Sequence, residues 1–182
     1  MANKKTVKDD ANEELKIYKT PPRSEEAEKN FLGALITDGS LFEKVREEYG
    51  VLNPDEFSVK NNSIIYQQIL SRVVSSDDFN VTVLCAMLEQ NGLLETVGGS
   101  SYVSSLTELT GPSAAIVDYA RIIRETSRRR KLIRVAEYIR KICYNPEGRS
   151  VTEIYDEAQG LVFELAEKKS EQNEGPQPMT MV

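Results

Sequence analysis

A few residues in this chain have the types and spacing that phosphate chemistry requires. In a nucleotide-binding loop, glycine-rich backbone presents N–H groups to the phosphates, a Lys supplies charge, and a Ser or Thr binds magnesium. The chain contains three Lys-Ser/Thr pairs, and none follows a glycine: Lys5-Thr6, Lys19-Thr20 and Lys169-Ser170. Gly98-Gly99 opens a helical stretch where an anion could bind. No Lys stands beside it, so a break between helices is the better interpretation. We therefore expect no ATP-hydrolysing site.

Other catalytic chemistry has equally little support. The 182-residue chain contains no histidine, which removes the commonest general base and the commonest transition-metal ligand. Its carboxylates are scattered, and no pair is singled out as catalytic. The two cysteines, Cys85 and Cys143, lie in separate apolar helical contexts. This is typical of small buried thiols and suggests a reducing compartment. We predict that the chain is not an enzyme and binds no cofactor or metal.

The sequence also predicts a compartment. No apolar run approaches the roughly 20 residues of a membrane span. The N-terminal stretch MANKKTVKDDANEELK has charge but no apolar segment after it, so it is not a signal peptide. We expect a soluble cytoplasmic protein without a membrane partner, long enough to fold without disulfides.

The spacing of apolar residues predicts helices and no β-hairpin, so the expected fold class is all-α. Ser24, Asn80 and Ser113 are predicted N-caps, because such side chains accept hydrogen bonds from the first N–H groups of a helix. Gly92 is expected to close the fourth helix in a left-handed conformation. The longer helices are expected at about Asn62 to Ser75, Ala114 to Tyr144 and Thr152 to Lys169.

These elements divide the chain into four parts. Residues 1–19 are polar and lack periodicity, so we expect a flexible arm. Residues 20–111 are predicted to form a small helical globular subdomain. Residues 112–169 hold two long helices joined by the short turn Asn145-Pro146-Glu147-Gly148, which predicts an antiparallel hairpin. Residues 170–182 have the composition of the start of a disordered linker.

The hairpin helices carry apolar stripes wider than one partner helix needs. Packing of the two helices on each other accounts for part of them. A hairpin that projects from a small domain covers only one side of itself, so the remaining apolar surface predicts contact with another chain. The simplest closed arrangement is a two-fold dimer, extendable to a ring. The candidate self-association residues are Leu132, Val135, Ile139, Ile142, Ile154, Ala158, Leu161, Val162 and Leu165.

Positive charge is concentrated in one segment. The net charge is −6, but residues 119–149 carry +7, which leaves −13 for the rest of the chain. Arg128, Arg129, Arg130 and Lys131 form a possible basic patch for nucleic acid. We favour a solvated helix face, because aromatic residues that could stack on bases are not interleaved with the patch. Acidic residues of the antiparallel helix are expected to balance it: Glu153, Asp156, Glu157, Glu164 and Glu167.

Three stretches of the chain carry a resemblance to a known family. They are TPPRSEEAEKNFLGALITDGSLFEKV, GLLETVGGSSYVSSLTELTGPSAAIVDYARIIRETSRRRK and YNPEGRSVTEIYDEAQGLVFELAEKK. In order and spacing they closely resemble the N-terminal domain of the bacterial replicative DNA helicase, the ring protein of the DnaB family. The resemblance runs from about Thr20 to Pro176.

The resemblance implies that hairpins pair two subunits and that three pairs form a collar. The collar would sit on six RecA-like motor domains, which bind ATP, magnesium and single-stranded DNA. Primase docks on such a collar, and loader proteins engage the ring. Because Glu174–Pro176 matches the start of the linker to the motor, we expect this chain to be the N-terminal scaffold portion of such a helicase. Candidate residues that carry or transmit the primase contact are Tyr102, Ile133, Ile139 and Ile154.

Two other interpretations stay open. One is a complete small regulator that mimics the collar and binds a helicase, its loader or primase; a reading frame that continues into a phosphate-binding loop would exclude it. The other is a nucleic-acid-binding helical protein that uses the basic sixth helix. That protein would show a DNA affinity that falls steeply with salt.

Overall fold

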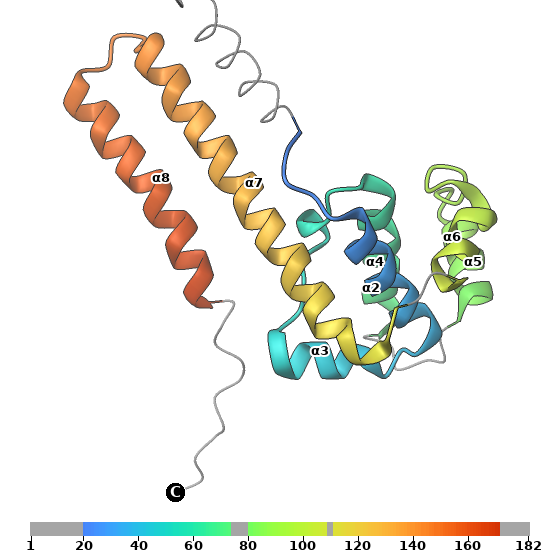
Figure 1. The fold of residues 1–182 in the computed structure, drawn as a ribbon. Coiled ribbons are helices and arrows are strands. Elements are labelled where there is room, and N and C mark those ends of the chain that lie inside the picture. Colours follow the sequence, from blue (N-terminus) through green and yellow to red (C-terminus); the bar gives the residue numbers. More distant parts are fainter. Residues whose placement is uncertain (1–19, 74–79, 109–110, 172–182) are drawn as a thin grey trace, which may run out of the picture.

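The computed structural model describes residues 20–73, 80–108 and 111–171. Within these ranges every regular element is helical, which confirms the all-α prediction (Figure 1). None of the described helices is long and apolar enough to cross a membrane. The elements are α2 (Glu25–Thr37), α3 (Leu41–Tyr49), the 3-10 turn η1 (Pro54–Glu56), α4 (Lys60–Val73), α5 (Val81–Gln90), α6 (Gly99–Glu108), the 3-10 turn η2 (Ser113–Ala115), α7 (Ile116–Tyr144) and α8 (Val151–Glu171).

Helix α2 forms the centre of the globule. Its residues from Phe31 to Ile36 are all buried, because α4, α6 and α7 pack around it. Three aromatic rings meet on this core: Phe57 and Tyr66 have ring centroids 4.8 Å apart, and Phe31 lies 5.8 Å from Tyr66. Tilted rings at such distances gain contact energy beyond the area they bury. The globule is therefore held mainly by apolar packing around one helix.

Helix α7 belongs to both parts of the molecule. Ile116, Ala120 and Ile123 lie in the hydrophobic core of the globule, although the sequence prediction placed them in the hairpin. After Ser127, the next buried residue of α7 is Ile142. The second half of α7 leaves the globule and runs antiparallel to α8, so the hairpin projects from the globule as one arm (Figure 1).

The helix ends follow the predicted signals in part. The Asn80 side chain accepts hydrogen bonds from the N–H groups of Thr82 and Val83, as expected of an N-cap, and Gly92 has the predicted left-handed φ of 66°. Ser24 occupies the N-cap position of α2 without a capping hydrogen bond. The prediction for Ser113 was wrong, because this residue lies in η2 and α7 begins three residues later.

Two helix starts use carboxylates that the sequence reading did not assign. At α8, Glu153 accepts from the N–H and hydroxyl of Ser150, whose oxygen accepts from the Glu153 N–H in return. This reciprocal pairing satisfies two otherwise free N–H groups. At α4, the buried carboxylate of Glu28, on α2, accepts from the N–H groups of Ser58 and Val59. A side chain of one helix thus fixes the start of another.

Candidate self-association surface and the root of the hairpin

The two hairpin helices are joined by a thin apolar contact. Among the side chains that the structure describes here, only Ile142 of α7 and Ile154 of α8 are buried. Polar contacts strengthen the turn end: the Tyr138 hydroxyl donates to Glu157 at 2.6 Å, and Arg149 binds the other oxygen of Glu157 at 3.0 Å. The hairpin is therefore closed at its tip, while much of its apolar surface stays outside the contact.

The uncovered apolar surface gathers along one side of the hairpin. A shallow groove of about 620 Å³ runs there, and we call its lining the apolar flank: Ile139, Tyr155, Ala158, Gln159, Val162, Phe163 and Ala166. Tyr155 is 71% exposed, Phe163 60% and Val162 49%. Full burial of one such side chain stabilises by about 1.5–3 kcal/mol. An apolar surface of this kind is a candidate interaction site.

The globule does not cover the apolar flank. Successive helix residues are separated by about 100°, so residues three, four or seven apart share a face. The face of α7 that packs on the globule carries Ala120, Arg124 and Ser127, all buried. Leu132 lies on another face and is 51% exposed. On the flank itself, Tyr155, Val162 and Phe163 are all at least 49% exposed, so the described part of the globule leaves it free.

The structure divides the predicted self-association residues into three groups. Ile142 and Ile154 are buried between the helices and serve the hairpin itself. Leu132 and Val162 are exposed, and either could contact a second molecule. The remaining five are half-buried along the seam: Val135, Ile139, Ala158, Leu161 and Leu165. Sequence reasoning missed Tyr155 and Phe163 as site residues. The one sequence feature that could have identified them is their size, because these large aromatic side chains widen the apolar stripe of α8.

The four candidate primase residues are not brought together. Tyr102 lies on α6, which Figure 1 places on the side of the globule away from the hairpin. Its hydroxyl donates to the amide oxygen of Asn62 at 2.6 Å, so it helps to hold the globule. Ile154 is buried, Ile139 lies on the apolar flank, and Ile133 is 41% exposed. No single surface of the described chain contains all four.

The basic stretch also separates into different roles. Arg130 donates to the carbonyls of Pro22 and Glu56, at 2.9 and 2.5 Å, and burial lowers the pKa of Arg130. Lys131 pairs with Asp55 at 3.3 Å, and Arg129 pairs with Glu125 on its own helix. The Nη2 atom of Arg128 is buried and makes no hydrogen bond.

The expected balance between this stretch and the acids of α8 was therefore wrong for Glu153, Asp156, Glu157 and Glu164, while the side chain of Glu167 lies outside the described residues. The partners of Arg130 and Lys131 belong to the globule, because these residues lie where α7 still touches it. Two of the four basic groups are held in these contacts, which leaves less free charge for nucleic acid than the sequence suggests.

A buried ion pair stands at the root of the hairpin, and the sequence prediction missed it. Arg124 donates through Nε to Glu56 at 3.1 Å, and through its other nitrogens to the carbonyls of Tyr49 and Val51. Its guanidinium also lies 4.7 Å from the centre of the Tyr49 ring. Glu56 accepts in addition from the N–H of Asn53. The signal for this second contact was available, since Asn53 and Glu56 have capping-box spacing.

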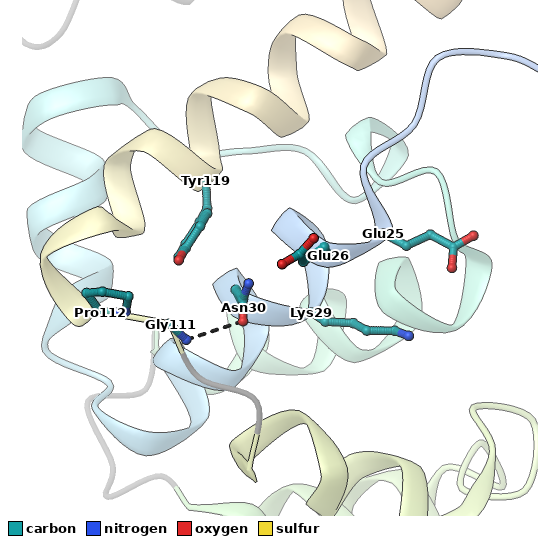
Figure 2. A pocket seen from close by; sticks show the side chains of 7 residues that line it. All are labelled: Glu25, Glu26, Lys29, Asn30, Gly111, Pro112 and Tyr119. Atoms are coloured by element: carbon teal, nitrogen blue, oxygen red, sulfur yellow. Dashed lines mark hydrogen bonds between the residues drawn. The ribbon is translucent and has the colours of Figure 1, made fainter.

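A polar pocket of about 640 Å³ lies between α2 and the start of α7 (Figure 2). Its lining includes Glu25, Glu26, Asn30 and Tyr119. The N–H of Gly111 donates to Asn30 at 3.3 Å, and a Cβ atom at Gly111 would overlap the Tyr119 hydroxyl. Glycine is thus required here for close approach. Within the described residues, no group of three or more potential ligands is placed to hold a metal ion.

The described chain thus consists of a helical globule with a long projecting hairpin, and its class follows from comparison with known families. The family model for the DnaB-like helicase N terminal domain matches residues 20–125, and the chain belongs to this family. The resemblance stated from the sequence is confirmed.

Relatives and a solved structure agree with this assignment. The replicative DNA helicase DnaB of Pasteurella multocida is 32% identical over 157 residues, covering 86% of this chain and 33% of the relative. The replicative DNA helicase DnaC of Bacillus subtilis is 32% identical over 150 residues, covering 82% of this chain and 32% of the relative. The chain thus spans about one third of the length of these relatives. The crystal structure of the N-terminal domain of DnaB helicase from Mycobacterium tuberculosis matches with a TM-score of 0.71 and 24% identity, over 79% of this chain and 99% of that one.

Proposed function

We propose that this chain is the N-terminal scaffold of a replicative DNA helicase and that it self-associates through the apolar flank of its hairpin. The observation that carries the proposal is the exposure of Tyr155, Val162 and Phe163 along one groove. Water contact with these side chains is unfavourable, and an isologous contact between two flanks would remove it on both chains at once. Three such dimers would then build a collar.

The rest of the proposed role concerns the longer protein. The collar would support motor domains that bind ATP and magnesium and act on DNA at the replication fork in the cytoplasm. It would dock primase and contact the loader of the helicase. This chain itself would supply assembly and docking and no catalysis. The match to relatives described as replicative DNA helicases over one third of their length supports this division of labour.

The oligomeric state tests the proposal. Light scattering of the purified chain is expected to give the mass of a dimer or a larger even-numbered assembly. Phe163→Lys is expected to shift the mass to that of a monomer, because it places a charge in the contact, while the melting temperature of the monomer fold is retained. The matched control is Ile122→Lys, which changes a 39% exposed residue of α7 outside the flank. A monomeric parent chain at high concentration, or equal effects of both variants, would exclude the flank.

Primase docking needs its own experiment. Immobilised chain is expected to retain the cognate primase at low salt. If the assembled chain fails to retain primase, the primase contact must lie elsewhere on the helicase. Because Tyr102 and Ile133 lie on separate surfaces, Ile133→Asp distinguishes a hairpin contact from one on the globule.

A further inference from the structure

Helix α7 has a defined point at which it parts from the globule. In the described chain, no residue of α7 beyond Lys131 makes a hydrogen bond or ion pair with the globule. No residue between Ser127 and Ile142 is buried. The last contacts are those of Arg130 and Lys131. The Lys131 pair involves an Asp55 side chain that is 65% exposed, and such a pair contributes little.

Arg130 differs from its basic neighbours in what it joins. One of its terminal nitrogens donates to Pro22, in the segment before α2, and the other to the carbonyl of Glu56 in η1. A planar guanidinium that donates two hydrogen bonds fixes the orientation of its partners as well as their distance from it. Glu56 is itself held by Arg124 and by the Asn53 N–H. Arg130 therefore connects the hairpin side of α7 to the segment before α2 and to η1, and η1 is held independently by Arg124.

We propose that Arg130 is the residue that sets the direction of the hairpin relative to the globule. Without it, the last firm contacts of α7 are those of Arg124 and Ser127. Small rotations of the helix about these residues would then no longer be restrained at Arg130. The apolar flank would keep its structure but would no longer point in one direction. The inference concerns a single chain and does not depend on the proposed self-association.

A distance measurement between the two parts tests this. Cys143, which is exposed near the hairpin tip, serves as one label site. The second is introduced as Gln67→Cys on the exposed side of α4, in a Cys85→Ala background. Pulsed electron paramagnetic resonance then gives the distribution of distances. Labelled protein is diluted into excess unlabelled protein, so that contacts between copies add no signal.

Arg130→Ala is expected to shift and broaden the distance distribution, with helix content retained. Arg130→Lys, which can keep only one of the two bonds, is expected to give an intermediate width. The matched control is Arg134→Ala, four residues further along α7 and exposed, which should leave the distribution unchanged. Equal distributions for Arg130→Ala and the parent would overturn the proposal, as would equal broadening by Arg134→Ala. If Arg130→Ala does not fold, an unchanged width in Arg130→Lys overturns it.

Discussion

The guanidinium of Arg124 and the carboxylate of Glu56 are joined at 3.1 Å, and their side chains are only 1% and 2% exposed. They come from α7 and η1, which are far apart in the sequence. Every terminal nitrogen of the arginine also has a carbonyl partner. A buried pair with its remaining groups satisfied is stable as a unit but costly to break.

Removal of one partner of this pair should therefore destabilise the fold strongly. Arg124→Met keeps much of the side-chain volume and leaves the Glu56 charge buried without its partner, which costs about 3–5 kcal/mol. Urea denaturation at neutral pH measures the loss. The control is Arg121→Met, whose pair with Asp118 is more than half exposed and contributes about 0–1 kcal/mol. Similar losses in the two variants would mean that the buried pair contributes no more than a surface pair.

The contact between Gly111 and Tyr119 predicts a rescue by a second substitution. Gly111→Ala places a Cβ atom against the Tyr119 hydroxyl, and overpacking of this kind costs about 1–3 kcal/mol. Tyr119→Phe removes the oxygen, although the ring carbon that bore it still lies 3.2 Å from the added atom. The double variant should recover part of the lost stability in thermal melts. Strictly additive effects would show that the two residues do not compete for this space.

Alkaline pH should destabilise the globule through Tyr66. Burial raises the pKa of this phenol above its ordinary value of 10.0. The folded state thus favours the neutral form, and this contribution is fully present below pH 10.0 and is lost as pH rises through the raised pKa. Urea melts between about pH 8 and about pH 11 should show a falling free energy of unfolding. The free energy of unfolding of the Tyr66→Phe variant should fall less steeply with pH. That of Tyr155→Phe, changed at an exposed position, should fall as in the parent.

The capping pair of α8 should stabilise the hairpin turn. Ser150→Ala removes the oxygen that accepts from the Glu153 N–H and the hydroxyl that donates to the Glu153 carboxylate. The expected cost is about 1 kcal/mol. Hydrogen exchange should detect it as faster exchange in the first turn of α8 and unchanged exchange in α2. Uniform acceleration across both helices would indicate that the hairpin and globule unfold together.

Local patterns in the sequence predicted the local parts of this structure. Asn80 and Gly92 were identified correctly, because a cap depends on residues within one turn. The burial of Arg124 was not predicted, since its partner Glu56 lies 68 residues away in the chain. From the sequence alone, this arginine is one of ten basic residues in the segment 119–149, which has a solvated appearance. Its role depends on which loop folds against it, and that is decided by tertiary packing.

The candidate site was predicted to a similar degree. The width of the α8 stripe indicated an uncovered apolar surface, and the structure places such a surface on the hairpin. The residues predicted for this surface were less accurate. Periodicity identifies a face of a helix, but not which residues of that face the partner helix covers. Ile142 and Ile154 are covered, while Tyr155 beside them is not.

The unsupported length of α7 has a mechanical consequence. From Arg130 to Tyr144 the helix rises about 21 Å, at roughly 1.5 Å per residue. A tilt of about 10° at Arg130 would carry the far end sideways by about 4 Å, roughly two thirds of the height of a helical turn. Sub-ångström adjustments near Pro22 or Glu56 would thus be magnified several-fold at the turn between α7 and α8.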